Sequence, residues 1–145
     1  MSGSDDIILP NQARLITADI VTKKADEAMA LKKRKEEEAR QVQVAFMERD
    51  IHPDVKKRVS TAVKRAAERG EQQVLVVQFP SDWCSDRGRA INNADPDWPK
   101  TLTGFAKRAY DYYVKELQPH GYGARAEILN FPGGMPGDVG LYLTW

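Results

Sequence analysis

The stretch Gln73–Trp98, QVLVVQFPSDWCSDRGRAINNADPDW, decides the fold because a strand-like run there passes into a long polar loop. Val74–Val77 is a continuous apolar run, which predicts a strand over Gln73–Phe79 that is buried in a parallel sheet. The loop Phe79–Trp98 holds the only cysteine of the chain. Because long ordered loops are often functional, this loop is the first candidate for a site.

A helix and two further strands follow the loop. Apolar residues at helical spacing predict a helix from Pro99 to about Leu117. Ala124–Phe131 and Val139–Thr144 are predicted strands, and the second one alternates apolar residues with small or polar ones. A strand–helix–strand unit predicts parallel pairing, and a short loop reverses the chain into the last strand. We therefore expect a mixed sheet.

Two helices are predicted before the sheet. About Gln12–Arg49 has no Pro or Gly and is rich in strong helix formers, which predicts one long helix. Its middle, Lys32–Gln41 (KKRKEEEARQ), is charged on every face and cannot be buried. Pro53 suits the first turn of a second helix that ends near Arg69, before Gly70.

The predicted fold class is α/β, with α+β as the alternative. Its elements are a small three-stranded mixed sheet in the order helix-helix-strand-helix-strand-strand, preceded by the long charged helix. The predicted domains are a disordered N-terminus (1–10), the helix as an appendage (11–50) and a small α/β domain (51–145).

Composition limits the class of protein. The 145 residues are 41% hydrophobic and 30% charged, with a net charge of +1, which suits a soluble protein. A single cysteine excludes an internal disulfide framework and fits a reducing compartment. No apolar run is long enough to span a membrane, and the N-terminus lacks the features of a signal peptide. We expect a cytoplasmic protein that does not bind membranes.

The long helix is a candidate interaction surface. A heptad frame contains two lysines and four alanines in nine seam positions, which makes a poor coiled coil. The alternatives are a solvated helix that docks only at its ends and a helix that pairs with a second copy or a protein partner. The second alternative places Leu15, Ile16, Ile20 and Val21 in the contact, within residues 11–50.

The second candidate surface is an edge of the sheet. If the first two strands are parallel, the loops that follow them, 80–98 and 132–138, emerge at the same edge, where ligands of open α/β sheets bind. The candidate binding residues at this edge are Asp82, Trp83, Cys84, Asp86, Arg87, Arg89, Asn92, Asn93 and Asp138.

Specific chemistries at this edge fail on spacing. The interval from Cys84 to Arg89 is one residue too short for the loop of cysteine phosphatases, and Gly88 is one residue too late for that of sulfurtransferases. His52 and His120 form no metal-binding pair with each other or with Cys84. The glycine-rich loop near residue 133 lacks the lysine of a phosphate loop. We predict no catalytic residue, metal or cofactor.

The predicted second helix supplies a basic face. Its residues are Lys56, Lys57, Arg58, Lys64, Arg65 and Arg69. Basic faces of this kind contact nucleic-acid phosphates, but the acidic C-terminal half of the chain disfavours nucleic acid as a partner.

The favoured hypothesis is therefore an interaction module that self-associates or binds a partner through the long helix, with a ligand surface at the loop edge. One alternative is a small enzyme that uses Cys84 or Asp82 together with Arg87 or Arg89. The other is a weak nucleic-acid binder that uses the basic helix, residues 54–69.

Overall fold

The computed structural model describes residues 7–145, which fall into two units, residues 7–42 and 43–145. Most of the predicted disordered segment, residues 1–10, lies outside the described residues, and Pro10 already belongs to a helix. The division comes before the predicted domain boundary at residue 50 because Phe46 packs against the core of the second unit.

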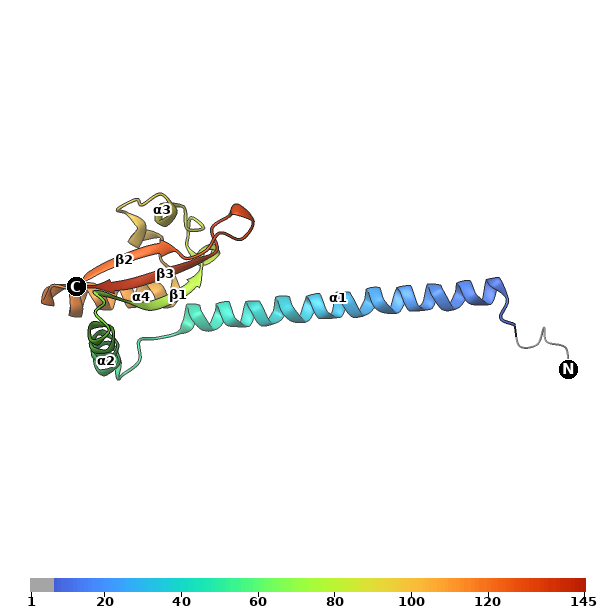
Figure 1. The fold of residues 1–145 in the computed structure, drawn as a ribbon, viewed down its shortest axis with the longest axis horizontal. Coiled ribbons are helices and arrows are strands. Elements are labelled where there is room, and N and C mark those ends of the chain that lie inside the picture. Colours follow the sequence, from blue (N-terminus) through green and yellow to red (C-terminus); the bar gives the residue numbers. More distant parts are fainter. Residues whose placement is uncertain (1–6) are drawn as a thin grey trace. The chain divides into compact units, whose positions relative to one another are not determined.

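A single helix makes up nearly all of the first unit. The last residues of this helix, 43–48, belong to the second unit. Helix α1 (Pro10–Glu48) has 39 residues and none of them is buried (Figure 1). At 1.5 Å per residue it is about 58 Å long. An ion pair between Arg40 and Glu37, 2.7 Å apart, lies in its charged middle. The long N-terminal helix predicted from the sequence is confirmed.

The second unit contains the remaining helices and the sheet in the predicted order. Its elements are α2 (Val55–Glu68), β1 (Gln73–Pro80), α3 (Arg89–Asn92), α4 (Gly104–Tyr112), β2 (Gly123–Ile128) and β3 (Asp138–Thr144). The single turn of α3 lies inside the loop that follows β1. The α/β class with three strands is therefore confirmed.

The helix predicted from Pro99 to Leu117 is divided into parts. A 3-10 turn at Trp98–Thr101 precedes α4, and a π-helical turn at Tyr113–Leu117 follows it. Leu102 and Thr103 are extended between the first two parts, because Leu102 is buried in the core and the Thr103 hydroxyl donates a hydrogen bond to the carbonyl of Trp83.

The sheet is antiparallel throughout, so the prediction of a mixed sheet is wrong. The strand order is β1-β3-β2, and β3 pairs antiparallel with both neighbours. Val139 in β3 lies opposite Phe79 on one side and Ile128 on the other. Strands β1 and β2 still run in the same direction, but β3 lies between them.

Strand β3 suits the central position because of its residue alternation. Val139, Leu141 and Leu143 are all buried on the core face. On the opposite face, a Cβ atom added to Gly140 would lie 3.0 Å from Leu75 Cδ1 and 2.9 Å from Leu129 Cδ2. The missing side chain therefore lets leucines from both sides close over the middle of the sheet.

The prediction that β1 is a fully buried strand is also wrong. β1 is an edge strand, and Leu75 and Val76 are 41% and 45% exposed. A bulge interrupts the register between Leu75 and Val77. One face of an antiparallel sheet commonly remains in contact with solvent, so an apolar run does not require burial on both sides.

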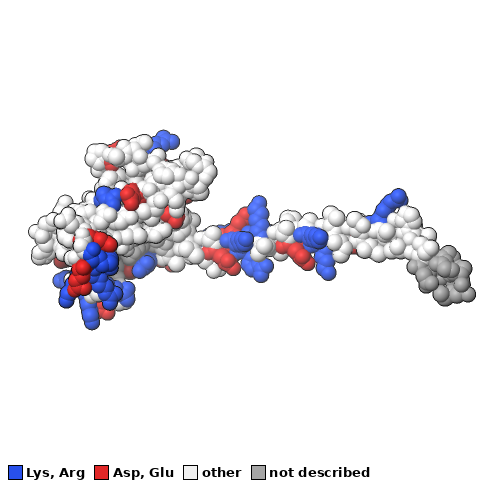
Figure 2. Space-filling view, viewed as in Figure 1, with Lys and Arg blue, Asp and Glu red and all other residues white. Residues whose placement is uncertain are grey.

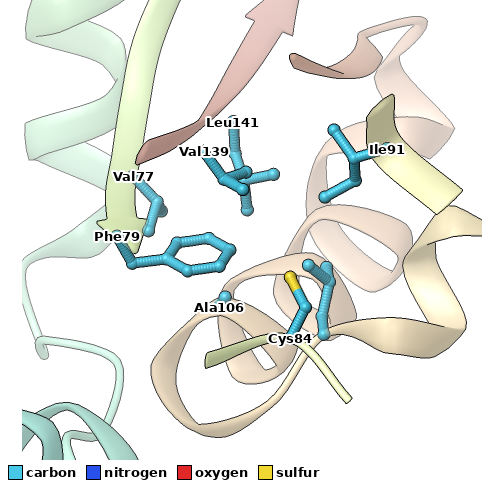
Figure 3. Packing of buried hydrophobic residues seen from close by; sticks show 8 residues of the cluster. Val77, Phe79, Cys84, Ile91, Ala106, Val139 and Leu141 are labelled. Carbon is cyan, nitrogen blue, oxygen red and sulfur yellow. The ribbon is translucent and has the colours of Figure 1, made fainter. Parts of the chain in front are cut away.

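The core lies between the sheet, the loop after β1 and α4. Figure 3 shows Val77 and Phe79 of β1 and Val139 and Leu141 of β3 facing Ala106 of α4, with loop residues closing the cluster. Phe46 packs against this cluster, with its ring centroid 5.3 Å from that of Phe79. The sheet and the loop after β1 thus share one hydrophobic core.

A search of the helices within residues 7–145 found none that is both long and apolar enough to cross a membrane.

Candidate functional site

The two loops predicted to share an edge lie in contact. The amide of Ser81 donates to the carbonyl of Gly137 at 2.9 Å, and the Ser81 hydroxyl donates to the carbonyl of Pro136 at 3.0 Å. This contact follows from the common direction of β1 and β2, which brings both loops to one end of the sheet. Whether this edge binds a ligand stays a prediction.

Asp86 has a structural role in the loop. Its Oδ1 accepts a hydrogen bond from the Gly88 amide at 3.0 Å, and its Oδ2 accepts one from the Ala90 amide at 2.8 Å. These bonds hold the turn that leads into α3, where Gly88 has φ +81°. With one hydrogen bond on each carboxylate oxygen, Asp86 stabilises the conformation of this loop.

Cys84 lies in the core. Its side chain is 4% exposed, and Figure 3 shows the sulfur directed into the buried cluster. Burial raises the pKa of the Cys84 thiol from 9.0 to about 11. A nucleophilic cysteine requires a lowered pKa and access to its substrate, so this geometry does not support the enzyme that would use Cys84.

Trp83 and Asp138 also support the fold. The Trp83 ring is half-buried against Phe46, with centroids 4.8 Å apart. The Asp138 carboxylate accepts a hydrogen bond from the Gln78 amide at 3.2 Å, and its backbone amide donates to Asn130 at 2.9 Å. Trp83 thus connects the loop edge to α1, and Asp138 connects it to β1 and to Asn130.

The remaining five side chains of the predicted edge are exposed. They are Asp82, Arg87, Arg89, Asn92 and Asn93. Arg87 has φ 58°, which extends the left-handed turn before α3. In the part of the chain that the structure describes, no three His, Cys, Asp or Glu side chains converge to hold a metal ion. The edge therefore presents exposed charged and amide side chains, whereas Trp83, Cys84, Asp86 and Asp138 hold the loops in place.

The basic face of α2 is exposed along its length. All six predicted residues are solvent-exposed, and Figure 2 shows Lys and Arg side chains gathered over α2 with acidic side chains beside them. Arg69 forms an ion pair with Glu71, with Nη2 and Oε2 3.2 Å apart. The acidic neighbours reduce the attraction that this face has for phosphates, and binding of nucleic acid stays a prediction.

Sequence reasoning missed an apolar cavity in the second unit. It has a volume of about 140 Å³ and lies between the sheet and helices α2 and α4. Val59, Ala109 and Leu143 are among its walls, and Tyr112 also lines it. Helical spacing of apolar residues predicts which side chains face the core, but it does not show whether the facing side chains fill the space between them.

Sequence reasoning also missed a regular spacing on α1. Ile20, Leu31 and Val42 of α1 recur every eleven residues, as does Leu9 directly before the helix, and each is 45% to 61% exposed. Eleven residues complete slightly more than three helical turns, so these side chains lie close to one face. The heptad frame used on the sequence has the wrong period to find this row, which we call the eleven-residue seam.

Comparisons with protein-family models, with curated proteins and with solved structures found no match to this chain.

Proposed function

We propose that this protein is a self-associating interaction module in which the α1 helices of two copies pair antiparallel. The observation that carries the proposal is the eleven-residue seam: Ile20, Leu31 and Val42 lie on one face of a helix that has no buried residue, and Leu9 directly precedes that helix. Helices in proteins gain most of their stability from packing of an apolar face, and nothing within Pro10–Val42 supplies such packing.

The seam favours a second copy as the partner because it is complementary to itself. In an antiparallel pair centred between Ala25 and Asp26, Ile20 of one copy lies level with Leu31 of the other. Leu9 lies level with Val42 in the same arrangement. Every seam residue thus meets a seam residue, and burying each of these side chains is worth about 1.5–3 kcal/mol.

The charges of α1 support the same register. One pair of opposite charges lies level beside the seam: Lys24 of one copy with Glu27 of the other, each about 40° around the helix from its nearest seam residue. A parallel pair in register would instead place Lys32–Lys35 beside the same residues of the other copy, and like charges at an interface oppose association. A closed antiparallel pair with twofold symmetry avoids this repulsion.

Sedimentation of the full chain tests the proposal. We expect a dimer for the native sequence and a monomer for the double variant Ile20→Glu/Leu31→Glu, because it places four carboxylates in the apolar contact. The matched control is Met29→Glu, which adds a carboxylate at an exposed residue on the opposite face of α1 and should remain a dimer. A monomeric native chain, or dissociation by the control alone, would refute the proposal.

The orientation has its own test. A spin label attached to Arg40→Cys should give a distance of about 44 Å between the two copies, from 29 residues of axial offset at 1.5 Å per residue. Cys84 is buried, so labelling is directed to the added cysteine. A distance below about 20 Å would indicate parallel helices.

A charge exchange tests the register. Lys24→Glu should weaken the dimer several-fold, because it places like charges level at two symmetric sites, and exposed pairs are worth about 0.2–1 kcal/mol each. The double exchange Lys24→Glu/Glu27→Lys should restore the native affinity. Equal affinities for all three proteins would exclude this register.

A further inference from the structure

The apolar cavity of the second unit is the feature with the clearest unused chemistry. Its walls come from three layers: Val55 and Val59 on α2, Phe105 and Ala109 on α4, and Leu141 and Leu143 on β3. The cavity belongs entirely to the unit Gln43–Trp145. It includes no residue of the eleven-residue seam and meets the loop 80–98 at its last residue, Trp98.

The size of the cavity determines what it can hold. A dry cavity of about 150 Å³ with aliphatic and aromatic walls holds a benzene molecule. The cavity of this protein has about 140 Å³. It is therefore close to the size that holds a single six-membered ring.

The cavity is open to solvent at the edge of the sheet. Val76 and Val77 both line it, although consecutive residues of a regular strand point to opposite faces. The bulge in β1 at Val76 explains how both can do so. Because Val76 is also 45% exposed, the wall of the cavity reaches the protein surface at this residue.

One polar atom near the cavity lacks a partner. Tyr112 lines the cavity, and its hydroxyl oxygen is buried without a hydrogen-bond partner among the described residues. The neighbouring Tyr113 differs, because its hydroxyl donates to the carbonyl of Tyr122 at 2.9 Å. Buried hydroxyl groups in native structures are nearly always hydrogen-bonded, so the Tyr112 hydroxyl is a candidate contact for a ligand.

Two further observations restrict the chemistry of the ligand. Burial, together with the charge of Glu116, raises the pKa of Tyr112, so its hydroxyl stays protonated and can donate at neutral pH. Arg125, the only charged residue on the cavity wall, forms an ion pair with Glu127 at 2.7 Å. A charged ligand would lose its hydration without gaining a free counter-charge.

We propose that this cavity binds a small neutral aromatic molecule with one hydroxyl or carbonyl group, such as a phenol. The ring lies among the valine, alanine and leucine side chains, and the polar group forms a hydrogen bond with the Tyr112 hydroxyl. Tyr112 also lines an adjoining, more polar hollow together with Ser60 and Glu116, so the polar end of the ligand lies toward that hollow.

Titration of the isotope-labelled full chain with phenol and with benzene tests the proposal by NMR. Both ligands should cause saturable shifts of backbone amides around Val59 and Ala109, and phenol should bind more tightly. Tyr112→Phe should reduce the preference for phenol over benzene roughly three- to tenfold, the value of one hydrogen bond. Tyr110→Phe is the matched control, because it removes a hydroxyl from the same helix and the same cavity wall but should leave the preference unchanged.

Filling the cavity provides the second measurement. Ala109→Leu should abolish binding of both ligands. Val59→Ile, which adds only one methyl group, should weaken binding of both and replaces Ala109→Leu if that variant does not fold. The proposal is overturned by an absence of saturable shifts, by shifts centred away from the cavity, by filled variants that bind as well as the native chain, or by a phenol preference that survives Tyr112→Phe.

Discussion

The two units of the chain use their apolar side chains in opposite ways. In Gln43–Trp145, residues from the sheet, α4 and the loop after β1 are buried together in one cluster. In α1, large apolar residues such as Ile20 and Leu31 are exposed and no residue is buried. The comparison shows that the compact unit is stabilised from within, whereas the apolar surface of α1 is available for a contact with another molecule.

The largest expected difference between the units is in the response to truncation of an apolar side chain. Phe79→Ala should lower the free energy of unfolding by about 3–5 kcal/mol, because it leaves a void in the core. Met29→Ala should change it by less than about 0.5 kcal/mol, because Met29 is exposed on α1. Urea unfolding monitored by tryptophan fluorescence measures both values, and similar losses for the two variants would contradict the comparison.

The C-terminal end of α1 contains both kinds of apolar residue, exposed ones and one that packs in the compact unit. Phe46 belongs to α1, yet its ring centroid lies 4.8 Å from Trp83 and 6.3 Å from Phe105. Phe46→Ala should therefore destabilise the compact unit by about 3 kcal/mol. Val44→Ala, two residues earlier on an exposed position, is the control and should cost less than about 0.5 kcal/mol. Equal losses of unfolding free energy for the two variants would show that Phe46 does not stabilise the compact unit.

The sequence predicted the elements better than their arrangement. Helical composition and strand-like runs are local properties, so the element order and the length of α1 were predicted correctly. The position of β3 between β1 and β2 depends on pairing between residues such as Phe79 and Val139, which are far apart in the chain. No local pattern contains that information, and the assumption of adjacent parallel strands led to the mixed sheet.

The candidate loop edge shows the same limit at the level of single residues. Loop position and residue type placed Cys84 and Asp86 among the binding candidates. The structure instead places Cys84 in the core and uses both oxygens of Asp86 to hold the turn. The sequence of a polar loop does not show whether its cysteine and aspartate face solvent or support the backbone. Only tertiary contacts distinguish these two roles.

Cys84 makes the buried character of the loop measurable through pH. Its pKa is about 11 in the folded protein, against an ordinary value of 9.0, so the folded state holds the thiol proton more tightly. The resulting stabilisation is complete below pH 9.0 and is lost as the pH rises toward 11, which amounts to about 2–3 kcal/mol.

The measurement is the free energy of unfolding of the native chain and of Cys84→Ala at several pH values. Between about pH 8 and pH 11 the native chain should lose about 2–3 kcal/mol more than the variant, because only the native chain has the buried thiol. Lysines and tyrosines titrate in both proteins, so their contribution cancels in the comparison. Parallel pH profiles would show that the thiol is not protected by burial.

The smallest effect concerns the contact between the two loops of the edge. Gly88 has φ +81°, and a Cβ atom added there would lie 2.8 Å from the Cβ of Ser81. Ser81 cannot move away easily, because its amide and hydroxyl are both bonded to the loop before β3. Gly88→Ala should therefore cost about 2 kcal/mol, from left-handed backbone strain and from this contact together.

Gly121→Ala separates these two causes. Gly121 also has a left-handed backbone, with φ +98°, but an added Cβ atom would meet nothing within 4 Å. Its substitution should cost about 1 kcal/mol, which is the backbone strain alone. The difference between the two variants in urea unfolding then measures how firmly Ser81 holds the two loops together. Equal costs would mean that the loop edge adjusts freely, unlike the core beneath it, and would make the edge a deformable surface instead of a rigid one.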